Sequence, residues 1–153
     1  MSFFSKKVII LSLNIQIAYK FASIISEKHG MKLVNFDNLT GEILTSPNYA
    51  DYSKKVELLI KSVEKNTICI VEPQILFQFC NSNVLKDFII IYLNVEKELF
   101  FSYMSKKHDI FLEPFVFDEL NQYYSQKSNI ITDIKDFSDN TIKKVDKIVM
   151  ELN

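Results

Sequence analysis

Arginine is missing from this 153-residue chain, and glycine occurs only at Gly30 and Gly41. All 18 basic side chains are therefore lysines. Arginine presents a planar fork that binds carboxylates and phosphates through two parallel hydrogen bonds, which lysine does not reproduce. Glycine is the residue that most readily adopts the positive φ of anion-binding loops. These two absences restrict the anion chemistry that the chain can perform.

Long apolar runs, metal-ligand spacing and a strong net charge are also missing. No stretch approaches the roughly 18 consecutive apolar residues of a membrane span, so we expect none. The first seven residues lack the features of a signal peptide, and we expect a cytoplasmic protein. A net charge of -1 favours neither nucleic acid nor an acidic membrane surface. Cys69 and Cys80 predict buried, reduced thiols and no metal site.

Short apolar runs alternate with amphipathic segments along the whole chain, with no internal repeat or linker. Runs that read as buried strands lie at 8–11, 32–36, 67–71, 88–93 and 129–132. The first amphipathic segment has apolar residues spaced i, i+4, i+7 and i+8, namely Ile17, Phe21, Ile24 and Ile25. Alternating buried strands and helices predict a parallel sheet covered on both faces.

Several residues are expected to begin or end the helices. Gly30 is a stop signal for the first helix, and His29 just before it is placed to favour the helix dipole. Asn94 is expected to cap a helix that contains Leu99 and Phe100. Asp139 or Asn140 is expected to cap the last helix. Residues 38–50 and 106–114 read as loops.

The order of these segments resembles shikimate kinase over nearly the whole chain. Residues 26–37 are similar to the family's helix end, second strand and following D-x-D, and 91–99 to its fourth strand and exit. Residues 123–133 are similar to its passage into strand five. The resemblance implies one α/β domain over 1–153, with a shortened lid near 105–114. It also implies a three-layer P-loop kinase-like fold, with helices on both faces of a five-stranded parallel sheet in the order 2-3-1-4-5.

The phosphate-binding P-loop of such kinases, G-x-x-x-x-G-K-[ST], falls on residues 12–19 when the resemblance is followed. In that motif backbone N–H groups surround the phosphates, the lysine neutralises their charge and the hydroxyl holds Mg²⁺. The residues at the four fixed positions are instead Ser12, Ile17, Ala18 and Tyr19. Ile15 and Ile17 also disfavour positive φ and fill the volume of a phosphate. We therefore predict a degenerate phosphate loop.

The other catalytic positions implied by the resemblance have changed as well. The acidic pair after the second strand appears as Asn35 and Asp37, and residues 72–74 replace a glycine triplet after the third. The lid segment has no arginine but keeps the cationic side chains Lys106, Lys107 and His108. Phosphoryl transfer depends almost wholly on positioning and charge stabilisation, so these losses together indicate lost catalysis.

Two main hypotheses follow. In the first, the chain is a catalytically inactive shikimate kinase-like protein, without a cofactor, that binds a protein partner or associates with itself. In the second, it is a divergent small-molecule kinase or nucleotide-binding protein that transfers phosphate from ATP with Mg²⁺. Lys20, Asp37 and the lid lysines would then supply the charges, although Lys20 lies about 200° around the helix from the usual lysine.

A third hypothesis is a remnant ligand site without catalysis at the carboxyl ends of the strands, where such folds bind ligands. Its candidate residues are Asn14, Lys20, Asp37 and Glu72, with Asp109 as a further carboxylate. The aromatic residues around the lid are expected to be mainly core; they are Phe3, Phe4, Phe100, Phe101, Phe111 and 115–117. Any exposed part of this region would serve as a partner surface.

Overall fold

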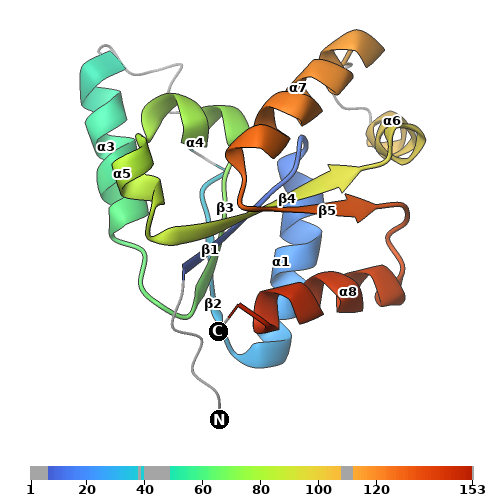
Figure 1. Cartoon of the computed structure of the whole chain (residues 1–153), viewed down its shortest axis with the longest axis horizontal. Coiled ribbons are helices and arrows are strands. Elements are labelled where there is room, and N and C mark those ends of the chain that lie inside the picture. The colour runs from blue at the N-terminus through green and yellow to red at the C-terminus, as the bar shows by residue number, and fades with distance from the viewer. Residues whose placement is uncertain (1–6, 38, 40–48, 108–111, 153) are drawn as a thin grey trace.

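A computed structural model describes residues 7–37, 39, 49–107 and 112–152 of the chain. Helices and strands alternate along it (Figure 1). In chain order they are β1 (Lys7–Leu11), α1 (Ile15–His29), β2 (Lys32–Asn35), α3 (Tyr49–Lys61), β3 (Thr67–Ile70), α4 (Pro73–Phe79), α5 (Ser82–Leu85), β4 (Phe88–Val95), α6 (Lys97–Lys106), α7 (Pro114–Lys127), β5 (Ile130–Ile134) and α8 (Asp139–Met150). The five predicted strands are all present.

The strands form one parallel sheet in the order β2-β3-β1-β4-β5. At its centre, Ile9 of β1 lies between Cys69 of β3 and Ile90 of β4. Parallel neighbours of this kind need crossover connections, which the intervening helices supply. This order confirms the predicted three-layer P-loop kinase-like fold.

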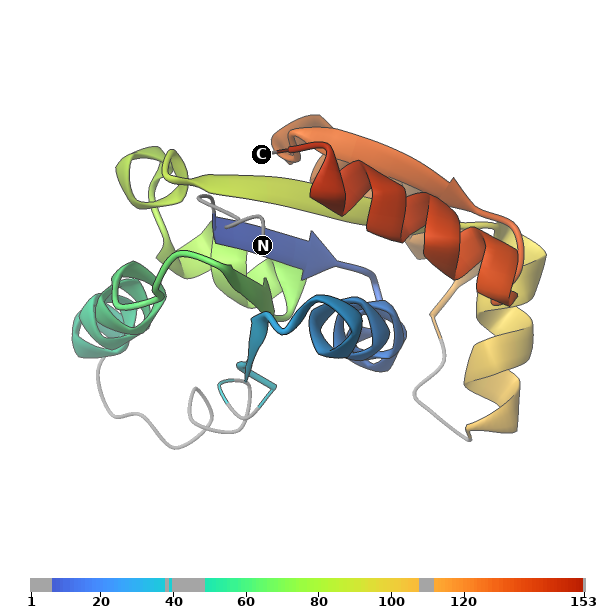
Figure 2. The ribbon, with the colours of Figure 1, turned by 90° about the horizontal axis from the view of Figure 1, so that it is seen from below.

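Two apolar layers enclose the sheet, which explains why its strands are apolar without alternation. Val8 and Ile10 of β1 pack into a layer beneath α1 and α8. Ile9 and Leu11, on the opposite face, pack into a layer beneath α3, α4 and α5. Figure 1 shows α1 and α8 on one side of the strands and α3, α4 and α5 on the other, and in Figure 2 α8 lies in front of β4 and β5. The central strands are therefore buried on both sides.

Two of the expected helix caps were wrong. Asn94 belongs to β4, because β5 pairs with that strand through Val95, and its side chain donates to Asp133 Oδ1 at 3.0 Å. Glu96 instead precedes α6. Ser138, rather than Asp139 or Asn140, caps α8, and its hydroxyl accepts the Thr141 N–H. The strand before α6 thus extends further than the local pattern indicated, whereas α8 begins earlier than expected.

The two cysteines are free and buried, as expected. Burial raises the pKa of the Cys69 thiol to about 12, against a lowering effect of Lys7. Burial also raises the pKa of the Cys80 thiol to about 12, and the negative charge of Glu57 adds to this effect.

In the part of the chain that the structure describes, no group of three or more His, Cys, Asp or Glu side chains could hold a metal ion. No helix within the same ranges is long and apolar enough to cross a membrane.

Candidate functional site at the carboxyl ends of the strands

The loop between β1 and α1 contains only Ser12, Leu13 and Asn14, because α1 begins at Ile15. Most of the segment predicted to replace the phosphate loop is therefore helical. Three of its side chains, Ile15, Ile17 and Ala18, are buried in the layer between α1 and the sheet. Tyr19 is 41% exposed on the helix surface. The isoleucines thus belong to the core face of a regular helix, where positive φ is not required.

Asn14 caps the N-terminus of α1 with its own side chain. Its Oδ1 accepts the Gln16 N–H at 2.8 Å, and its backbone carbonyl accepts the Ile17 N–H at 3.1 Å. Its amide Nδ2 lies 3.2 Å from Met104 Sδ and donates to it. Met104 belongs to α6, the helix that leads into the lid segment. Leu13 and Met104 both pack against the core. One backbone donor of the helix terminus, the Gln16 N–H, is therefore satisfied by a side chain of the chain itself.

Ser12, at the position of the first P-loop glycine, is 1% exposed. Its hydroxyl has no hydrogen-bond partner among the described residues, and the same holds for Thr132 on β5. A buried hydroxyl without a partner costs free energy that a paired one does not. Ser12 is thus buried, whereas the Asn14 side chain makes hydrogen bonds to Gln16 and Met104.

The aromatic residues near the lid divide into a buried and an exposed group. Phe100 and Phe117 are 1% and 3% exposed, and their ring centroids lie 5.0 Å apart. Phe101 lies 5.6 Å from the former and 5.4 Å from the latter. Phe115, at the start of α7, is 69% exposed. Core packing therefore accounts for most of the region, as expected, while Phe115 remains on the surface.

The cationic lid residues are described only in part. Lys106 and Lys107 are exposed at the end of α6, and the Lys107 ammonium lies 5.7 Å from the ring centroid of Tyr103. His108, Asp109 and Phe111 lie outside the described residues, as do Phe3 and Phe4. The two lysines therefore belong to the surface at the end of this helix.

The residues proposed for a remnant ligand site belong to different parts of the chain. Asp37 is exposed beyond β2, and its N–H donates to Asn35 Oδ1 at 2.9 Å. Glu72 precedes α4 and is half-buried. The Lys20 ammonium lies 5.3 Å from the ring centroid of Phe137, which packs against the α1 and α8 layer. Lys20 is thus an exposed lysine whose ammonium lies beside an aromatic ring.

A buried tyrosine network lies near Glu72, and the sequence reading did not identify it. The Tyr92 hydroxyl donates to Asn121 Oδ1 of α7, and the Tyr92 and Tyr124 ring centroids are 6.3 Å apart. Burial raises the pKa of Tyr92, and the neighbouring Tyr124 adds to the effect. Burial is the main cause that raises the pKa of Tyr124, and the charges of Tyr123 and Glu72 raise it further. A tyrosine within an apolar strand indicates a buried hydroxyl, but not its partner.

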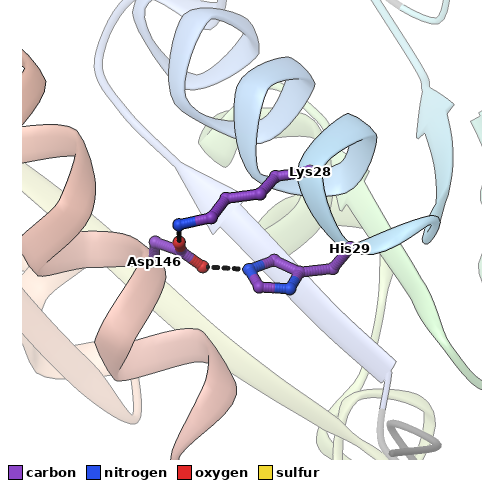
Figure 3. Close-up of polar contacts among 3 residues, drawn as sticks. All are labelled: Lys28, His29 and Asp146. Atoms are coloured by element: carbon purple, nitrogen blue, oxygen red, sulfur yellow. Dashed lines mark hydrogen bonds and ion pairs between the residues drawn. The ribbon is translucent and has the colours of Figure 1, made fainter. Parts of the chain in front are cut away.

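A second polar cluster, also missed, joins α1 to α8 (Figure 3). Lys28 Nζ lies 2.8 Å from Asp146 Oδ2, and His29 Nε2 lies 2.6 Å from Asp146 Oδ1. The Asp146 side chain is only 9% exposed, so Lys28 and His29 both contact a nearly buried carboxylate. His29 does lie in the last turn of α1, as predicted, but it also contacts a distant carboxylate.

No protein-family model matches this chain, and no curated protein matches its sequence. Solved structures are similar to it throughout. A gluconokinase from Sinorhizobium meliloti 1021 has a TM-score of 0.64 at 9% identity, covering 99% of this chain and 95% of its own. A shikimate kinase from Bacteroides thetaiotaomicron has a TM-score of 0.64 at 13% identity, covering 96% and 97%. The YorR protein from Bacillus subtilis, in complex with phosphorylated GDP, has a TM-score of 0.63 at 15% identity, covering 95% and 96%. The chain has the fold of these P-loop kinases.

Proposed function

We propose that this chain is a catalytically inactive shikimate kinase-like protein that binds a protein partner or associates with itself. The observation that supports it most is the N-terminus of α1, which Asn14 caps and Met104 contacts. By the resemblance, a kinase of this fold places its phosphates at this terminus. Here the Asn14 side chain takes up one backbone donor, the Gln16 N–H, that would otherwise face an anion.

The charges near this terminus support the same proposal. Residues 12–19 contain no lysine, no arginine and no glycine. The nearest lysine along the chain, Lys20, lies against the ring of Phe137. Because a phosphoryl-transfer transition state is stabilised mainly by positioned positive charge, a site of this composition is poorly suited to the reaction. We therefore propose that the chain acts through its surface.

Titration calorimetry with Mg·ATP and Mg·ADP tests the proposal. We expect no saturable heat at concentrations up to the millimolar range. Micromolar binding would contradict the proposal, and Lys20→Met is the matched variant that would then show whether this lysine holds the nucleotide. Sedimentation velocity over a wide range of protein concentrations separates self-association from a requirement for another protein.

The likeness to solved kinases favours a second candidate, a divergent small-molecule kinase or nucleotide-binding protein that uses ATP and Mg²⁺. Asp37 is exposed at the carboxyl end of β2, where it would be accessible to a metal-bound nucleotide. ADP release from ATP in the presence of candidate hydroxyl acceptors measures this activity. Turnover that disappears in both Lys20→Met and Asp37→Asn would establish the kinase and contradict inactivity.

A further inference from the structure

All five strands of the sheet are parallel, so their amino ends lie at one side of the molecule, the amino-end face, and their carboxyl ends at the opposite side, the carboxyl-end face. A lysine lies at every amino end, as the first residue of the strand or at most three residues before it. These lysines are Lys7, Lys32, Lys65, Lys86 and Lys127. None of them forms an ion pair with another described residue. The amino-end face therefore presents a row of positive charges.

The carboxylates of the amino-end face do not cancel this charge. The same short segments contain two of them, Glu64 and Asp87, together with His29, which contacts Asp146. Five lysines and two carboxylates leave three positive charges in excess. The helix ends that reach this face add no net charge, since three lysines are matched there by three carboxylates; these are Lys28, Lys61 and Lys147, and Glu27, Asp146 and Glu151.

The carboxyl-end face has the opposite sign. From the last residue of each strand to three residues beyond it, the described chain has five carboxylates and two lysines; these are Asp37, Glu72, Glu96, Glu98 and Asp136, and Lys97 and Lys135. Three negative charges are therefore in excess, and Asp51 and Asp139 in the first turns of α3 and α8 raise the excess to five. Three further lysines near this face are matched by three further carboxylates; these are Lys20, Lys106 and Lys107, and Glu113, Asp118 and Asp133.

We infer that copies of this chain associate head to tail, with the amino-end face of one copy against the carboxyl-end face of the next. The inference rests on the proposed function and names the surfaces of the self-association. Each face is the electrostatic complement of the other, and complementary potentials steer and orient association. Two copies joined through the same face would instead bring like charges together, which is unfavourable. The contact is therefore heterologous, and each added copy leaves one face of either kind open.

Sedimentation velocity of the whole chain at low and high salt tests the inference. At about 20 mM salt we expect the sedimentation coefficient to rise with protein concentration, and at about 500 mM salt we expect that rise to be lost, because salt screens the charges of exposed faces. A chain that stays monomeric at low salt would overturn the inference. Association that persists unchanged at high salt would overturn it as well.

Two double variants identify the faces. Lys65→Glu with Lys86→Glu removes the positive excess of the amino-end face, and Glu96→Lys with Glu98→Lys removes most of the negative excess of the carboxyl-end face. Each variant alone should stay monomeric at low salt. Their mixture should form one-to-one pairs and nothing larger, because each variant retains one natural face and the two retained faces are complementary. A mixture that stays monomeric would overturn the head-to-tail arrangement.

The matched control is Lys143→Glu with Lys144→Glu, which changes the net charge equally on the exposed middle of α8. It should associate as the natural chain does, and a monomeric control would show that net charge rather than the two faces governs association. Circular dichroism checks each fold, and glutamine replaces the reversed charge in any variant that does not fold. Binding of the natural chain to anionic vesicles without self-association would overturn the assignment of a second copy. A monomeric natural chain would reject this inference alone, since the nucleotide titration tests inactivity independently.

Discussion

Asp136 lies in the turn before α8 and accepts hydrogen bonds from the hydroxyls of Ser138 and Thr141 and from the Ser138 N–H. These bonds lower the pKa of Asp136 from 3.8 to about 2. The bond from the Ser138 hydroxyl has the largest effect. Because the folded pKa is below the unfolded one, the bonds add stability that is fully present above about pH 4. That stability is lost as the pH falls through about 2.

We expect Asp136→Asn to lower the free energy of unfolding at neutral pH by removing this preference for the ionised side chain. The difference from the natural sequence should persist down to about pH 4 and shrink as the pH approaches 2. Urea unfolding at a series of pH values measures it, with the exposed Asp87→Asn as the control. A difference that stays constant down to pH 2 would refute the assigned role of Asp136.

At the scale of the element, the end of α1 depends on one backbone conformation. Gly30 has φ 63°, and its N–H donates to the Glu27 carbonyl at 3.4 Å. The next N–H, of Met31, donates to the Ser26 carbonyl at 2.9 Å. Apart from Gly30 itself and its two neighbours in the chain, no described heavy atom lies within 4 Å of the place where a Cβ of residue 30 would be. The cost of any side chain here therefore comes from the left-handed backbone and not from crowding.

We predict that Gly30→Ala lowers the free energy of unfolding by about 1 kcal/mol, because alanine disfavours the left-handed conformation. Gly30→Asn should cost less, since asparagine adopts this region more readily. Denaturant unfolding of the two variants makes the comparison. Equal stability of Gly30→Ala and the natural chain would show that α1 can end in another conformation.

At the scale of the whole molecule, Asp146 holds together helices that follow different strands. Lys28 and His29 are 118 and 117 residues away from it in the sequence. Since the carboxylate is nearly buried and both of its oxygens are engaged, its bonds should contribute more than a surface ion pair. The Lys147–Glu151 pair, with a separation of 3.9 Å and both side chains exposed, provides the comparison.

Asp146→Asn should lower the free energy of unfolding by about 2 kcal/mol, because it weakens two charge-assisted hydrogen bonds. Glu151→Gln should change it by less than about 0.5 kcal/mol. Thermal and urea unfolding of both variants, with the fold checked by circular dichroism, measure the difference. Effects of equal size would indicate that the link between α1 and α8 contributes no more than an exposed pair.

The sequence by itself determined the strands, most of the helices and, through the resemblance, the order of the sheet. These features depend on local patterns: continuous apolar runs make buried strands, and apolar residues at helical spacing make the inner face of α1. Gly30 ends α1 because its backbone preference is a property of one residue. Local pattern also placed Ile15, Ile17 and Ala18 where the phosphate motif would lie.

Only the tertiary structure decided which residues meet. Asn14 contacts Met104 across 90 residues, and Asp146 contacts the end of α1 from α8. Asn94 lies in β4 because β5 pairs beside it, although its type favours a cap. Ile24 follows the apolar pattern of its helix but remains 42% exposed. Periodicity identifies an apolar face, whereas the packing of neighbouring elements determines how much of that face is covered.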